Sequence, residues 1–249
     1  MITAVALEGL PEFHDGDDLA GLIAGAMTAG GPDPGDVLVL AHKAVSKAEG
    51  RTRRLSSVVP GEHALRLAAE LNKDPRHVQV VLDESTEVRR ARNGVLIVVT
   101  RHGFVCANAG VDASNAPDDD TVILLPIDPD RSARGLRARL GERFGVAPAV
   151  LITDSFGRAW RHGQCDVTIG CAGLRPYEDW RGRRDARGRE LRATFIAVAD
   201  ELASAADLAR SKDGMQPAVL VSGAGRYVTD EDGPGAQALV RGPEQDLFH

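Results

Sequence analysis

The sequence predicts a mixed α/β fold in which mixed sheets carry flanking helices, and three observations support this prediction. Apolar strand-like runs alternate with helical segments along the 249 residues. Some neighbouring runs are joined by short polar links, such as "RHG" at 101–103, which are typical of hairpins and so of antiparallel pairs. The chain is 43% hydrophobic, which is enough to bury a sizeable core. Because no change in composition is sharp, we expect a single catalytic domain over residues 1–249.

The first half of the chain begins with a strand and an amphipathic helix. "ITAVAL" (2–7) predicts the strand. "DDLAGLIAGAMTAGG" (17–31) predicts the helix, with Asp17 or Asp18 near its N-cap and Gly30 past its end. The remaining elements expected in this half are a loop at 30–36, a helix at 61–73, and strands at 36–41, 77–82, 94–100, 104–110 and 121–126.

The second half repeats this alternation. A helix with many arginines on its exposed side is expected at 128–145, and a polar segment at 177–190 separates later elements. The other elements expected here are strands at 148–152, 166–173, 191–199 and 217–223, and a helix at 200–212.

Composition excludes several classes of protein. A net charge of −6 argues against a general nucleic-acid binder, which needs a basic face. The three cysteines have no zinc-like spacing, and their odd number fits a disulfide framework poorly, so a reducing cytoplasm is expected. Neither a signal peptide nor a membrane-length apolar run is visible in the sequence. We therefore expect a soluble cytoplasmic protein with no membrane partner.

Two aspartates follow apolar strands and are candidate metal ligands. Asp112 lies in "GVDASN" and Asp154 in "ITDSFGRAWRHGQCD" (152–166). Carboxylates at strand ends suit Mg²⁺ or Mn²⁺, and the Ser155 hydroxyl could serve a second ion. For either aspartate taken alone, a role as a turn or N-cap residue is the favoured explanation. The hydrogen-bond donors that follow Asp154 favour a ligand site at this aspartate, although they also fit a solvated loop. These donors are Arg158, Arg161, His162 and Gln164.

A third motif, "AHKAVSKAEGR" (41–51), brings Lys43, Lys47 and Arg51 after a buried strand. Lysines in such a position can meet nucleotide phosphates. The chain lacks the P-loop pattern and a GxGxxG fingerprint after a strand, and spacing alone favours a solvent-facing lysine pair.

Taken together, these segments resemble the coenzyme F420 γ-glutamyl ligases from end to end. The segments that carry the resemblance are "EGLPEF", "KAVSKAEGR", "TRHGFVCANAGVDASN", "ILLPIDPDRSA", "ITDSFGRAWRHGQCD", "RDARGREL" and "VADELASAADL". The patterns GVDxSN and TD(S/T)xGRxWRxGQ within them are far more specific than a glycine motif. The chain matches the single-domain form, which lacks the C-terminal flavin reductase domain, so no FMN is expected.

The resemblance implies a GTP-dependent ligase that adds L-glutamate to the lactyl carboxylate of the unglutamylated deazaflavin coenzyme, with further γ-linked glutamates in some relatives. The reaction it implies passes through an acyl phosphate and releases GDP and phosphate. Two divalent ions, Mg²⁺ or Mn²⁺, are implied, with K⁺ as an optional further ion. An intertwined homodimer of mixed α/β subunits is implied as well.

The resemblance also assigns roles to residues. Asp112 and Asp154 match ligands of the first metal, and Ser155 matches a ligand of the second. With Arg158, these aspartates are the candidate catalytic residues. Residues matched to the GTP site are Leu10, Pro11, Glu12, Phe13, His42, Lys47 and Asn115. The segment "ARSKDGM" aligns with a nucleotide-site segment of the family.

Two points remain open within this assignment. His42 stands where relatives often carry a serine, which puts nucleotide choice in question. Asp166 and His162 are both candidates for the general base.

Because of His42, two other hypotheses stand beside the ligase. One is a metal-dependent amide ligase or phosphohydrolase with a different carboxylate or phosphate substrate, and the other is a nucleotide-binding regulatory protein without turnover.

Overall fold

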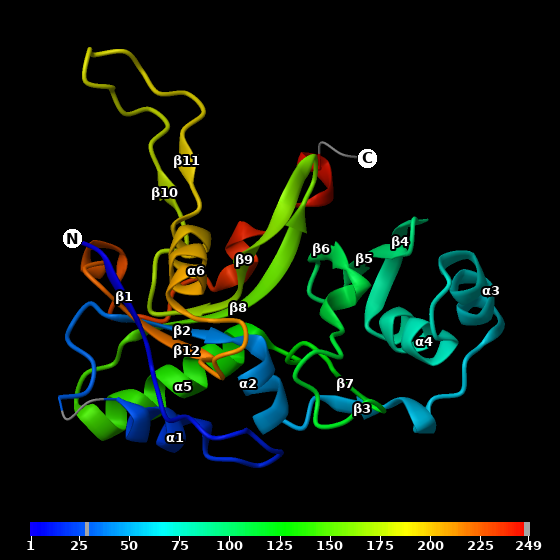
Figure 1. Ribbon diagram of the computed structural model, residues 1–249. Coiled ribbons are helices and arrows are strands. Elements are labelled where there is room, and N and C mark those ends of the chain that lie inside the picture. The colour runs from blue at the N-terminus through cyan, green and yellow to red at the C-terminus, as the bar shows by residue number, and fades with distance from the viewer. Residues whose placement is uncertain (28–29, 247–249) are drawn as a thin grey trace.

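A computed structural model describes residues 1–27 and 30–246 and confirms a mixed α/β fold with mixed sheets (Figure 1). The helices are α1 (Leu19–Ala26), α2 (His42–Ala48), α3 (Glu62–Leu71), α4 (Pro75–Asp83), α5 (Pro129–Phe144) and α6 (Val198–Ala209). The strands are β1 (Thr3–Ala6), β2 (Val37–Ala41), β3 (Thr52–Arg54), β4 (Ser85–Arg92), β5 (Val95–Thr100), β6 (Val105–Ala107), β7 (Thr121–Ile123), β8 (Ala149–Arg158), β9 (Arg161–Ala172), β10 (Glu178–Asp179), β11 (Phe195–Ile196) and β12 (Ala218–Ser222).

The main sheet has the strand order β1-β12-β2-β8-β9, in which β2 and β8 are parallel and the other neighbours are antiparallel. Both of its faces are buried. On β2, Leu38 and Leu40 pack toward α1, α2 and α5, while Val37 and Val39 pack toward α6. This alternation follows from the period of two in a strand. In Figure 1, α1 and α5 accordingly lie on one side of the sheet and α6 on the other.

A second lobe packs around its own core. It contains α3, α4, the pair β3-β7 and the antiparallel sheet β4-β5-β6, and its buried residues come mainly from these elements. Figure 1 shows this lobe beside the main sheet, connected through β3 and β7. The lobe matters for the site because β7 forms an isolated bridge with Asp112, which lies at the boundary between the lobes.

The prediction of a strand at 77–82 is wrong, because this segment lies within helix α4. Asp74 caps the helix by accepting a hydrogen bond from the Arg76 N–H (2.8 Å), and Pro75 occupies its first turn. Val78 and Val81, three residues apart, are both fully buried. This spacing and the Asp-Pro start are helix signals, but the run of valines resembles a buried strand.

Other elements differ in extent. The strand expected at 104–110 stops at Ala107 and continues as a 3-10 turn, and the strand expected at 191–199 shrinks to Phe195–Ile196 because α6 begins at Val198. Strand β4 was not predicted, although the "NG" that joins it to β5 is a strong hairpin signal. Asn93 and Gly94 both have positive φ there (52° and 73°).

The largest difference concerns residues 152–166. Instead of a loop, they form a β-hairpin: β8 runs on to Arg158 and pairs with β9 back to Ala172. The end of this hairpin projects from the body of the molecule (Figure 1). The sheet therefore presents Asp154 and Ser155 where the hairpin leaves the core, and carries Arg158 and Arg161 away from it.

Candidate functional site

A pocket of about 520 Å³ opens at the carboxyl ends of the parallel strands β2 and β8. Ligand sites of open α/β sheets collect at this edge. Its wall includes the ends of both strands, the segment before α1 and the segment between α6 and β12. The residues that line it are Pro11, Glu12, Phe13, Ala41, His42, Lys43, Ala44, Lys47, Asp112, Ser114, Asn115, Thr153, Asp154, Ser155, Gln164, Asp166, Arg210, Ser211, Lys212, Asp213, Met215, Gln216 and Pro217.

The register of β2 and β8 sets the first part of the site. Ala41 is paired with Thr153, so the next residues along the two parallel strands, His42 and Asp154, are neighbours at the sheet edge. The distance between His42 Nε2 and Asp154 Oδ1 is 3.4 Å. Asp154 Oδ1 also accepts a hydrogen bond from the backbone N–H of Ser155 (2.8 Å). The local backbone thus fixes the direction of this carboxylate.

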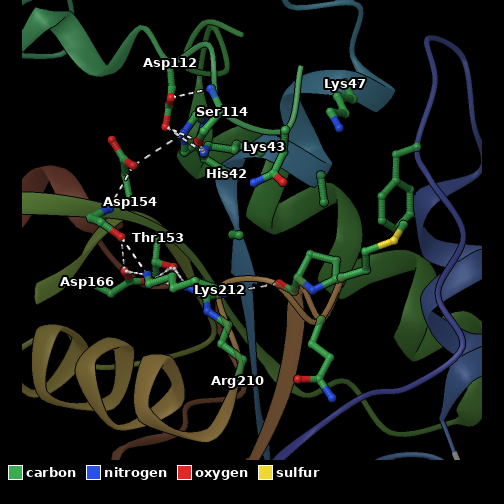
Figure 2. Close-up of a pocket in the computed structure, with 18 of the residues that line it drawn as sticks. His42, Lys43, Lys47, Asp112, Ser114, Thr153, Asp154, Asp166, Arg210 and Lys212 are labelled. Atoms are coloured by element: carbon green, nitrogen blue, oxygen red, sulfur yellow. Dashed lines mark hydrogen bonds and ion pairs between the residues drawn. The ribbon is translucent and has the colours of Figure 1, made fainter. Parts of the chain in front are cut away.

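Asp112 reaches the same pocket from the second lobe. Its backbone exchanges two hydrogen bonds with Ile123 of β7, at 3.0 and 2.8 Å. Its carboxylate accepts from the Ser114 N–H (2.7 Å) and from the Ser114 hydroxyl (2.9 Å), and lies 2.6 Å from Lys43 Nζ. Figure 2 shows Asp112 and Asp154 close together on one side of the pocket, with Lys43 and Ser114 beside Asp112.

The pKa of Asp112 lies below its ordinary value. Burial is the largest single influence and opposes ionisation, but the hydrogen bonds from Lys43 and Ser114 and the charge of Lys43 together outweigh it. The carboxylate therefore stays ionised, as a ligand for a cation must.

The loop that delivers Asp112 has an unusual backbone. Three consecutive residues, Asn108, Ala109 and Gly110, have positive φ (54°, 56° and 69°). A Cβ atom at Gly110 would lie 2.7 Å from Leu125 Cδ2. Both the left-handed backbone and this contact call for glycine at position 110.

We expect Gly110→Ala to lower the free energy of unfolding by about 2 kcal/mol, because it combines left-handed strain with overpacking against Leu125. Denaturant unfolding followed by circular dichroism measures the change. Gly157→Ala is the matched control, since Gly157 has no positive φ and open space around its Cβ position. Equal stability of Gly110→Ala and wild type would contradict the loop geometry.

Asp166 is buried beneath the pocket and is surrounded by donors. Its Oδ1 accepts from the Ser155 hydroxyl (2.7 Å), and its Oδ2 accepts from the Thr153 hydroxyl (2.7 Å) and from the Arg210 guanidinium. The Asp166 side chain is 0% exposed and that of Arg210 is 7% exposed. Because these donors engage both oxygens, Asp166 serves as an anchor that ties β8, β9 and the segment after α6 together (Figure 2).

Cationic side chains surround the rest of the pocket. Lys47, 7% exposed, forms an ion pair with Glu12. Lys212 Nζ lies 2.6 Å from Asp207 Oδ1 and 3.1 Å from Ser155 Oγ. Each of these lysines, like Lys43 and Arg210, is paired with a carboxylate. All four cations line a cavity large enough for a polyanionic ligand.

The oxygen ligands of the site fit a divalent ion that also binds phosphate. Within residues 1–27 and 30–246 there is no group of three or more His, Cys, Asp or Glu arranged to hold a metal ion. Mg²⁺ does not require such a group, because one or two carboxylates usually hold it together with waters and substrate phosphates. Asp112 and Asp154 are two such carboxylates in one pocket.

The structure brings most of the predicted site residues together. Those that line the pocket are Pro11, Glu12, Phe13, His42, Lys47, Asp112, Asn115, Asp154 and Ser155. Leu10 instead packs into the main core at 7% exposure. Arg158 lies near the tip of the β8-β9 hairpin, where it donates to the His162 carbonyl (3.0 Å). Neither Arg158 nor His162 is part of the pocket wall formed by the described residues.

Sequence reasoning missed several residues of the site. Thr153, Ser114, Arg210 and Lys212 all line the pocket. Thr153 and Ser114 stand next to the predicted ligands, and a search for hydroxyl residues around each aspartate would have found them. "ARSKDGM" pointed to the segment of Arg210 and Lys212, but no spacing within it marks either residue.

Two further features concern the cysteines and the helices. The three cysteines, Cys106, Cys165 and Cys171, are free. No helix in the described part of the chain has both the length and the apolarity needed to cross a bilayer.

Comparison with known proteins gives concordant matches. The profile of the family described as F420-0:Gamma-glutamyl ligase matches residues 9–223. A protein of Methanothermobacter thermautotrophicus named coenzyme F420:L-glutamate ligase is 44% identical over 250 residues, which cover 99% of this chain and 98% of the relative. A protein of the same name from Methanopyrus kandleri is 47% identical over 239 residues, with 95% and 93% covered. A third, from Haloarcula marismortui, is 43% identical over 249 residues, with 97% and 93% covered.

Proposed function

The chain belongs to the F420-0:gamma-glutamyl ligase family, and on that premise we propose that it ligates L-glutamate to the unglutamylated deazaflavin coenzyme. We further propose that GTP drives the reaction through an acyl phosphate. The observation that supports this most is that Asp112, Asp154 and four cationic side chains all line one pocket at the edge of the sheet. The cationic residues are Lys43, Lys47, Arg210 and Lys212.

In the proposed reaction, an oxygen of the coenzyme's carboxylate attacks the γ-phosphorus of GTP, and GDP leaves. The nitrogen of glutamate then attacks the acyl carbon, phosphate leaves, and the nitrogen loses a proton. Phosphoryl transfer depends mainly on positioning and on charge neutralisation. Lys47 and Lys212 can neutralise phosphate oxygens from two sides of the pocket, since they come from α2 and from the segment after α6. Glu12, Phe13 and Asn115 remain proposed contacts of the nucleotide.

Asp112, Asp154 and Ser155 would hold Mg²⁺ or Mn²⁺, which supplies further neutralisation of the transferring phosphoryl group. Lys43 balances the charge of Asp112, at a distance of 2.6 Å. Asp166 holds Ser155 through its hydroxyl and is therefore a positioning residue in this proposal. We assign the role of general base to neither Asp166 nor His162. Both carboxylate oxygens of Asp166 already accept hydrogen bonds, and His162 lies outside the pocket wall formed by the described residues.

An assay with purified protein, GTP, L-glutamate, MnCl₂ and unglutamylated coenzyme tests the proposal. We expect the coenzyme to gain the mass of one or more glutamyl units, with stoichiometric release of GDP and phosphate. GTP loss without that mass gain would instead favour a phosphohydrolase or a ligase of another carboxylate. Binding of GTP without turnover would favour a regulatory protein. Omission of glutamate is the control that separates ligation from simple hydrolysis.

We also propose that the chain forms an intertwined homodimer in the cytoplasm. Two extensions that project from the body support this assembly (Figure 1). One is formed by residues 177–196, which include β10 and β11, and the other is the far end of the β8-β9 hairpin. Tyr177 packs against Phe195 at the base of the first extension, with ring centroids 4.5 Å apart. Extended segments of this kind gain stability when a second chain packs against them.

A further inference from the structure

His42 is a buried histidine with one unused nitrogen. It is 1% exposed, and its Nδ1 lies 3.2 Å from the Ser46 hydroxyl, one turn along α2. Within the described chain its Nε2 has no hydrogen-bond partner, although the atom lies 3.4 Å from Asp154 Oδ1. Buried polar atoms are almost always satisfied, so this nitrogen calls for an explanation.

The position of the unused nitrogen points to a cation. If Nδ1–H donates to Ser46, Nε2 carries a lone pair that faces a carboxylate oxygen. Two electron-pair donors that face each other repel unless a proton or a metal ion lies between them. His42 Nε2 and Asp154 Oδ1 lie 3.4 Å apart, close enough for one ion to contact both atoms.

We propose that His42 Nε2 binds the same ion as Asp154, and that this nitrogen ligand shifts the site toward transition-metal ions and away from Mg²⁺. The inference rests on the metal site of the proposed function and goes beyond it by adding a ligand and a metal preference. Imidazole nitrogen suits transition metals, whereas Mg²⁺ is bound almost entirely through oxygen. A serine hydroxyl at position 42 would restore an oxygen-only set.

The other neighbours of Asp154 leave room for this role of His42. Cys106 is buried and is not part of the pocket wall formed by the described residues. Lys43 is engaged with Asp112. His42 therefore supplies the nitrogen atom that lies beside Asp154 Oδ1.

Pulsed electron paramagnetic resonance on the Mn²⁺-loaded protein tests the inference without an activity readout. We expect a histidine nitrogen coupling to Mn²⁺, which changes from ¹⁴N to ¹⁵N character when the protein is made with ¹⁵N-histidine. The coupling should vanish in His42→Ser and persist in His63→Ser, a control at an exposed histidine of α3. Adding unlabelled GTP leaves the assignment clear, because only histidine carries the label.

Calorimetric titration with Mn²⁺ and with Mg²⁺ gives the second readout. His42→Ser should weaken Mn²⁺ binding by roughly tenfold or more and change Mg²⁺ binding much less. Mn²⁺ binding that depends on Asp154 but shows no histidine coupling in the wild type would overturn the inference and leave the metal site intact. Mn²⁺ binding that Asp154→Asn does not weaken would overturn both. Because the isotope comparison uses the wild-type chain, a poorly folded variant would not prevent a decision.

Discussion

Asp154→Asn is expected to reduce the rate of glutamate ligation on the order of a thousandfold and to leave the fold intact. Rate losses of this size occur when one preorganised electrostatic contact to a transition state is removed. The amide removes a negative charge from the proposed metal site, and its oxygen can still accept from the Ser155 N–H, so the backbone keeps its hydrogen bond. Mass spectrometry of the coenzyme after single-turnover mixing measures the rate, and a thermal melt measures the fold.

Controls separate the loss of an ion ligand from a general loss of acidity. Asp112→Asn should behave like Asp154→Asn, because its carboxylate lies in the same pocket. Asp119→Asn is the matched control, since Asp119 is an exposed aspartate outside the pocket wall. Wild-type activity of Asp154→Asn at limiting Mn²⁺ would contradict its assignment as a metal ligand, and with it the proposed site.

The sequence marked Asp112 and Asp154 as candidates because each follows an apolar run. Their meeting in one pocket could not be read from that pattern, since Asp112 lies outside the main sheet and is held by its bridge with Ile123. Their exact partners could not be anticipated. The approach of His42 to Asp154 depends on the register of β2 against β8, which joins residues more than a hundred positions apart. Nothing in either segment alone encodes that register.

Arg158 shows where the structure departs from the sequence reasoning about residues 152–166. Polar residues after a strand suggest a loop that folds back over a ligand, but here β8 and β9 simply continue beyond the core as a paired hairpin. Outside the core both faces of a hairpin can be polar, so the alternation that marks a half-buried strand disappears. Arg158 and His162 therefore look like site residues in the sequence and lie away from the pocket in the structure.

The fold shows the same limit. Helix α5 (Pro129–Phe144) was predicted well because strong local signals mark both ends: Asp128 caps its start by accepting from the Arg131 N–H (2.9 Å), and Gly145 ends it at φ 72°. Residues 77–82 are a short valine-rich run, which suits a strand or a buried helix equally. The helix start lies before this run, at Asp74 and Pro75, and the helix packs against α3.

Removal of the Asp166 side chain should have the largest effect on stability. We expect Asp166→Ala to lower the free energy of unfolding by about 3–5 kcal/mol, because it removes the buried partner of the Arg210 guanidinium. Arg210, 7% exposed, would keep only the contact of its Nε with Asp207 Oδ1, at 3.4 Å. The hydroxyls of Thr153 and Ser155 lose an acceptor in the same substitution. Urea unfolding monitored by fluorescence and circular dichroism measures the change.

A double substitution distinguishes an anchor from a catalytic base. If Asp166 acts mainly to neutralise Arg210, then Asp166→Ala with Arg210→Met should recover much of the lost stability, because no unpaired buried charge remains. A catalytic base would add a second effect: the double variant would regain stability, but the pH profile of its residual ligation would differ from that of the wild type. Since both carboxylate oxygens of Asp166 already accept hydrogen bonds, we expect the first result, with Ser155 losing its fixed orientation in both variants.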